Sequence, residues 1–189
     1  MNKRSPRGVI PPVLFVLIGL AACAEPERFE RASGEEGTME TGDPDDPDDP
    51  EVDEDAILAQ AMAYEQELTL LTPEPELSET HSDAASVRVW GSSSAAELFS
   101  SIDPDDPTQE VSFAEGDMFV KEHFDEAGEV NGLTVMFKGP EGYDPDARDW
   151  YWARIRGDEL THSGRVQWCI DCHEAAFNSD LVVGFGKSP

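Results

Sequence analysis

Short segments that alternate apolar and polar residues fill the C-terminal half of the chain, and they constrain its fold more than any other feature. A period of two is typical of strands with one buried face, and β-branched and aromatic residues favour strands. The segments are 87–90, 118–121, 133–137, 150–155 and 164–167. Turn signals separate them, including Asn131-Gly132 and Arg156-Gly157-Asp158. Because strands do not alternate with long helices, the sequence predicts a mainly β, α+β fold with an antiparallel sheet.

Three segments have helical character. Residues 55–71 carry apolar side chains three or four positions apart, and Asp53 or Asp55 can serve as the N-cap. We expect this helix to pack on the chain's own domain, and packing on a partner is the alternative. Two shorter helices are expected at 94–102 and 171–179.

Near the C-terminus, residues 169–173 read Cys-Ile-Asp-Cys-His, the C-x-x-C-H pattern that attaches a c-type haem. Cys169 and Cys172 can each form a thioether with one haem vinyl group, and His173 then binds the iron as its proximal ligand. A zinc site would need two further Cys or His ligands at finger-like spacing, which the sequence lacks. A thioredoxin-type dithiol would belong to a βαβ pattern. The sequence therefore predicts one covalently bound haem c.

Residues 1–22 have the composition of a bacterial signal peptide. Basic residues precede a short apolar stretch, 13–20, which is too short for a membrane span. The stretch leads into Leu20-Ala21-Ala22-Cys23, which resembles the lipobox, where the cysteine is lipid-modified and becomes the first mature residue. We expect a lipid anchor at Cys23 and a location in the bacterial cell envelope, facing the periplasm or the exterior. A secretory signal with an incidental cysteine is the alternative.

Residues 23–85 are expected to form an acidic tether, with the helix at 55–71 inside it. Residues 24–86 hold 21 Asp or Glu and only two basic residues. The prolines of a proline and aspartate repeat at 43–50 prevent helix formation, and charge repulsion keeps the segment extended. An EF-hand calcium loop would need its glycine and closing glutamate at fixed positions, and neither is present. The folded domain is then expected at 86–189.

The order of several motifs resembles the cytochrome P-460 family and its relatives, the β-form cytochromes c-prime. The matching stretches are 116–121, 135–138, 150–154 and 169–173, followed by Asp180. The resemblance implies a curved antiparallel sheet with a few short helices, a homodimer and a five-coordinate haem. It implies hydroxylamine oxidation, with a lysine cross-linked to the porphyrin, for the enzymatic members. For the c-prime relatives it implies binding of nitric oxide or carbon monoxide.

By motif match, Lys121 resembles the cross-linking lysine, and Lys138 is the second candidate. The alternative for either is a solvated strand lysine whose stem lies on apolar neighbours. Arg154 is a candidate partner for a haem propionate, with a surface ion pair as the alternative.

Function depends on the sixth coordination position of the iron. A histidine or methionine there would make an electron carrier, because a closed site binds no substrate. The residues of these types are His81, His123, His162, Met118 and Met136. An open site among aromatic side chains would instead take a small ligand, and catalysis would need a proton acceptor. The candidate acceptors are Glu122, His123, Glu174 and Asp180.

We therefore expect a lipid-anchored mono-haem cytochrome that oxidises hydroxylamine or another small nitrogen species and passes electrons to a redox partner protein. A non-catalytic nitric oxide binder and a simple electron carrier are the alternatives. The formal net charge of −28 disfavours nucleic acid and anionic lipid headgroups as partners. Membrane attachment then depends on the lipid, and basic redox partners are attracted.

Overall fold

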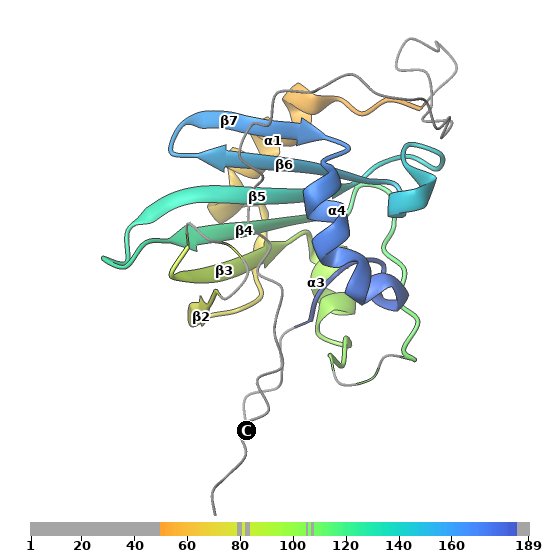
Figure 1. Ribbon diagram of the computed structural model, residues 1–189, viewed down its shortest axis with the longest axis horizontal. Coiled ribbons are helices and arrows are strands. Elements are labelled where there is room, and N and C mark those ends of the chain that lie inside the picture. The colour runs from red at the N-terminus through yellow and green to blue at the C-terminus, as the bar shows by residue number, and fades with distance from the viewer. Residues whose placement is uncertain (1–49, 79–80, 82–83, 105, 107, 185–189) are drawn as a thin grey trace, which may run out of the picture.

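The computed structural model describes residues 50–78, 81, 84–104, 106 and 108–184, which build a seven-stranded antiparallel sheet with short helices (Figure 1). The strand order is β1-β3-β4-β5-β6-β7, and β2 also pairs with β3. The strands are β1 (Thr69–Leu70), β2 (Glu76–Leu77), β3 (Ser86–Gly91), β4 (Met118–Phe124), β5 (Val130–Lys138), β6 (Trp150–Arg156) and β7 (Glu159–Gly164). The prediction of a mainly β, antiparallel fold is confirmed. The predicted signal peptide and the predicted lipid anchor at Cys23 lie outside the described residues.

Two local predictions are wrong. The Asn131-Gly132 pair lies inside β5, and the chain reverses before it, at 125–129, where Gly128 has φ +80°. The Asp125 carboxylate accepts hydrogen bonds from the backbone N–H groups of Ala127 and Glu129 and so fixes this reversal. Glycine is needed at position 132 for a different reason. A Cβ there would lie 2.5 Å from the Ile155 carbonyl oxygen on β6. The segment 164–167 is also not a strand, because β7 ends at Gly164 and a helix begins at Gln167.

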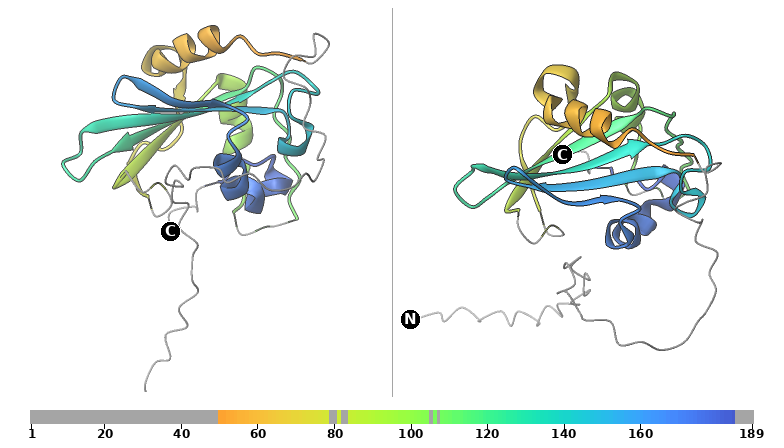
Figure 2. Two further views of the ribbon diagram at one scale, coloured as in Figure 1. Left: turned by 45° about the horizontal axis from the view of Figure 1, so that its top comes forward. Right: turned by 90° about the horizontal axis from the view of Figure 1, so that it is seen from above.

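Both faces of the sheet are covered, each by its own helices (Figure 2). One face carries Val120, Val135 and Tyr151 and forms a core with α1 (Glu54–Met62). The opposite face carries Phe119 and Trp152 and forms a core with α4 (Gln167–His173). This second core also includes Ala95 of α3 (Ser93–Phe99). A 3-10 helix, η1 (Pro145–Ala147), precedes β6, and another, η2 (Glu174–Ser179), follows α4. Because strand side chains alternate between faces, neighbouring residues of one strand belong to different cores.

The folded unit begins earlier than the predicted boundary at residue 86. The helix expected at 55–71 is present as α1 and α2 (Tyr64–Glu67), and Asp53 caps α1 by accepting a hydrogen bond from the Ala56 N–H at 3.0 Å. Ile57 and Leu68 are buried in the core, and β1 and β2 extend the sheet from β3. The prediction that this helix packs on its own domain is confirmed. The fold needs it because the sheet face beneath it is apolar and would otherwise contact water.

Candidate functional site

A cavity lies between α4 and the sheet face that carries Phe119 and Trp152. It encloses about 720 Å³ of empty space, part of it open to solvent. Cofactor and ligand sites are usually lined mostly by apolar groups with a few polar ones, as this cavity is. Its apolar wall includes Val89, Phe119, Met136, Trp152, Trp168 and Val182. Cys169, Cys172 and His173 line it from α4, so the structure brings all three residues of the C-x-x-C-H pattern to one cavity.

The imidazole of His173 is held in a single orientation. Its Nδ1 lies 2.6 Å from the backbone carbonyl oxygen of Leu181, and its ring packs edge-on against Trp152 at 4.9 Å between ring centroids. A carbonyl oxygen only accepts hydrogen bonds, so Nδ1 carries the proton and Nε2 keeps its lone pair. Burial, and then the nearby charge of Lys121, lower the pKa of His173 to about 4, although the Leu181 hydrogen bond opposes this shift. The ring is therefore a neutral imidazole, the form that binds a metal.

The two candidate lysines have different surroundings. Lys121 lies on β4, opposite Thr134 of β5, and lines the cavity. Its pKa is lowered to about 8, mainly by burial, while Cys169 acts in the opposite direction. Lys138 does not line the cavity: its Nζ lies 2.8 Å from Asp180 Oδ2 and 2.6 Å from the Arg148 carbonyl oxygen. Of the two lysines, only Lys121 is placed to reach a group bound in the cavity.

None of the three carboxylates predicted as proton acceptors lines the cavity. Glu122 follows Lys121 on β4 and points to the opposite face, where it accepts hydrogen bonds from Tyr64 Oη at 2.8 Å and Arg88 Nε at 3.0 Å. The prediction of Glu122 as a group facing the haem is therefore wrong, because adjacent strand residues face opposite sides. Asp180 is the ion-pair partner of Lys138, and Glu174 is exposed on η2.

The three histidines considered as candidate iron ligands have different surroundings. His123 lies fully buried on the cavity face of β4, with Nε2 3.2 Å from Thr134 Oγ1. His81, which the sequence placed in the tether, lines the cavity, and its ring packs on that of His123 at 5.0 Å between centroids. Its pKa is lowered, by burial first and then by Lys121. His162 is exposed and packs against Trp168. No local pattern marks His81, because a connection between β2 and β3 brings it to the cavity.

The remaining candidates also separate by face. Met136 lines the cavity, whereas Met118 is buried in the core on the α1 side. Arg154 is only 3% exposed, and its guanidinium carbon lies 5.9 Å from the centroid of the Trp168 ring. The alternative of a surface ion pair for Arg154 is therefore wrong, and the side chain lies near the cavity wall.

Among the residues that the structure describes, no three His, Cys, Asp or Glu side chains are grouped so that they could hold a metal ion by themselves. In the same part of the chain, no helix has the length and apolar character to cross a membrane. The chain matches no protein-family model and no curated protein.

Proposed function

We propose that this chain is a mono-haem c-type cytochrome, with haem joined to Cys169 and Cys172 and with His173 as the proximal iron ligand. One observation carries the proposal: His173 donates its Nδ1 proton to the Leu181 carbonyl and so keeps Nε2 available in a cavity that both cysteines line. Haem-ligating histidines commonly have such a partner on their second nitrogen.

The residues of the cavity fit this cofactor chemically. Two cysteine sulfurs on one helix suit the two vinyl groups, and the apolar wall suits a porphyrin. Buried Arg154 would be the partner of a propionate. Export would place the chain where c-type haem is attached in bacteria, with Cys23 as the lipid anchor and an acidic segment between anchor and domain.

The proposed reaction is oxidation of hydroxylamine or another small nitrogen species, with electrons passed to an external protein acceptor. When bound, haem would supply the iron that takes the nitrogen ligand and accepts its electrons. Hydroxylamine loses one proton with each electron, so a proton acceptor is required at the cavity wall. The predicted carboxylates do not line the cavity, and His81, which does, is a weak acceptor because burial lowers its pKa. Lys121 remains the proposed site of a covalent bond to the porphyrin.

Nitric oxide binding without turnover is the second candidate, and one observation favours it. The cavity is mainly apolar and lacks Glu122, Glu174 and Asp180 on its wall. Such a site would hold a small uncharged ligand without moving protons. The resemblance implies that the chain would form a homodimer, whether it is an oxidase or a nitric oxide binder.

Three measurements on the full chain, produced in a bacterium that attaches c-type haem, test the proposal. Intact mass should show one haem, which a Cys169→Ser/Cys172→Ser variant should lack. Peptide mapping should find the Lys121 peptide joined to the haem peptide, and Lys138→Arg, the matched control, should not change this. The ferrous spectrum should respond to nitric oxide.

Turnover of hydroxylamine with an artificial acceptor then distinguishes the two candidates. Turnover supports the oxidase, whereas a nitric oxide response without turnover supports the binding protein. A chain that carries no covalent haem would refute both. A low-spin spectrum indifferent to nitric oxide would identify an electron carrier instead.

A further inference from the structure

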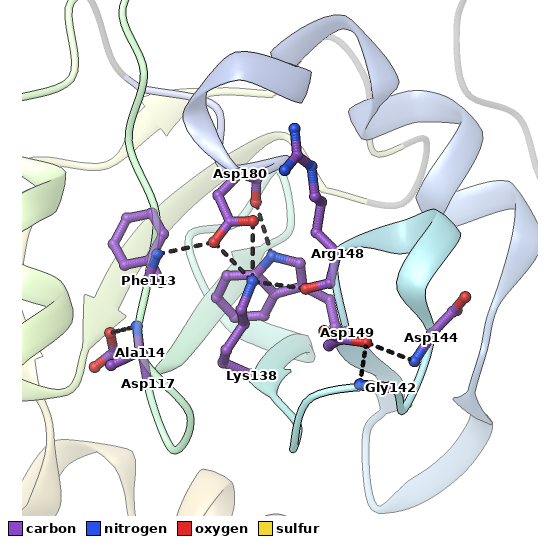
Figure 3. A network of polar contacts seen from close by, with 10 residues as sticks. Phe113, Ala114, Asp117, Lys138, Gly142, Asp144, Arg148, Asp149 and Asp180 are labelled. Atoms are coloured by element: carbon purple, nitrogen blue, oxygen red, sulfur yellow. Dashed lines mark hydrogen bonds and ion pairs between the residues drawn. The ribbon is translucent and has the colours of Figure 1, made fainter. Parts of the chain in front are cut away.

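Lys138 and Asp180 form a buried ion pair, which Figure 3 shows beside Phe113 and Arg148. Lys138 Nζ lies 2.9 and 2.8 Å from the two Asp180 carboxylate oxygens, and it also donates to the Arg148 carbonyl at 2.6 Å. Asp180 is 3% exposed, so solvent scarcely screens this pair. The ammonium group of Lys138 therefore has its partners on Asp180 and Arg148, away from the cavity.

The backbone at Asp180 is in an unusual conformation. Asp180 and Leu181 have φ values of 57° and 64°, in the left-handed region that residues other than glycine rarely adopt. Three contacts hold this corner: the Lys138 ion pair, the Phe113 N–H donating to Asp180 Oδ2 at 2.8 Å, and Trp150 Nε1–H donating to the Asp180 carbonyl at 2.7 Å. Two consecutive residues persist in this region only when their surroundings fix them.

This corner determines where the Leu181 carbonyl points. Leu181 is 1% exposed, and its carbonyl oxygen accepts the Nδ1 proton of His173. A hydrogen bond at this nitrogen orients the ring and raises the electron density on Nε2, which makes the imidazole a stronger ligand. The contacts of Asp180 therefore act on His173 through one shared backbone carbonyl.

We propose that Asp180 and Lys138 are positioning residues for the proximal ligand: their ion pair fixes the Leu181 carbonyl that orients His173 and strengthens its bond to iron. This inference rests on the proposed haem site. It gives both residues a role different from the cross-link and the proton transfer expected from the sequence.

The test compares haem-loaded Asp180→Asn with the wild-type chain. We expect the iron–histidine stretching band of the ferrous protein, measured by resonance Raman, to shift to lower frequency. We also expect the reduction potential to rise, because a weaker ligand stabilises ferric iron less. Lys138→Met, which keeps Asp180 and its Phe113 hydrogen bond, should shift both readouts in the same direction by a smaller amount.

Glu122→Gln is the matched control. It disrupts another ion pair, Arg88–Glu122, which has a similar distance of 3.0 Å but lies on the opposite face of the sheet. It should lower stability without changing the Raman band or the potential. Unchanged readouts in both test variants, or equal shifts in Glu122→Gln, would overturn the proposal.

Histidine NMR of the chain without haem separates this inference from the proposed function. A wild-type chain that never acquires haem refutes the cytochrome proposal. The same chain should still show His173 as the Nδ1-protonated tautomer, with that preference reduced in Lys138→Met. Loss of this difference would refute the positioning role, and its persistence would support the Leu181 contact independently of haem.

Discussion

Substituting Ile57 by alanine tests whether the fold begins before residue 86. Ile57 lies on α1, is 3% exposed, and packs in the core that includes Val120 and Val135 of the sheet. The substitution removes three carbon atoms, which at about 0.8 kcal/mol each gives about 2.4 kcal/mol. A cavity that closes only in part adds to this, so we expect the free energy of unfolding to fall by about 3 kcal/mol.

Urea unfolding followed by tryptophan fluorescence measures this loss. With a slope of about 1–3 kcal/mol per molar urea, the midpoint should fall by about 1–3 M. Met62→Ala on the same helix is the control, because Met62 is 54% exposed and its truncation should change stability by less than about 0.5 kcal/mol. Equal midpoints for Ile57→Ala and the wild-type chain would refute the reasoning, since α1 would then contribute nothing to the folded unit. If the chain carries the proposed haem, its spectrum should not change below the transition, because α1 lies on the face away from the cavity.

Two further substitutions test the two faces and the strand spacing. Glu122→Gln should lower the free energy of unfolding by about 2–3 kcal/mol in the same assay, because hydrogen bonds to a buried charge contribute about 1.5–3 kcal/mol. Unchanged stability together with altered ligand binding would instead place Glu122 at the cavity. Gly132→Ala should cost about 1–3 kcal/mol, seen as a lower melting temperature, since its Cβ would lie 2.5 Å from the Ile155 carbonyl oxygen. A melting temperature equal to that of the wild type would contradict this close contact between β5 and β6.

Local sequence patterns predict the strands well because alternation reflects burial directly. The same rule predicts that Glu122 points to the face opposite to Lys121, where it bonds to Tyr64 and Arg88. The Asn131-Gly132 pair misled because its glycine serves a close approach between strands and not a turn. Asn-Gly pairs most often form hairpin turns, whereas Gly132 is glycine because a side chain there would meet β6.

Long-range placement could not be predicted from the sequence. Residues before 86 read as an acidic tether because charge dominates their composition, although Ile57 and Leu68 carry the apolar surface that covers the sheet. His81 reaches the cavity through a connection with no periodic pattern. Contacts of this kind depend on which elements pair, and that information is not contained in a short window of residues.

Because side chains alternate along β4, substitutions at neighbouring positions of this strand should affect different properties of the protein. Odd-numbered positions such as Phe119 and Lys121 border the cavity, whereas even-numbered positions such as Val120 and Glu122 belong to the opposite side. A scan of consecutive substitutions from 118 to 122 would therefore give ligand-binding changes and stability changes in strict turn. Such a scan would map which face carries the chemistry even before any cofactor is identified, because the sheet separates the two sets of side chains.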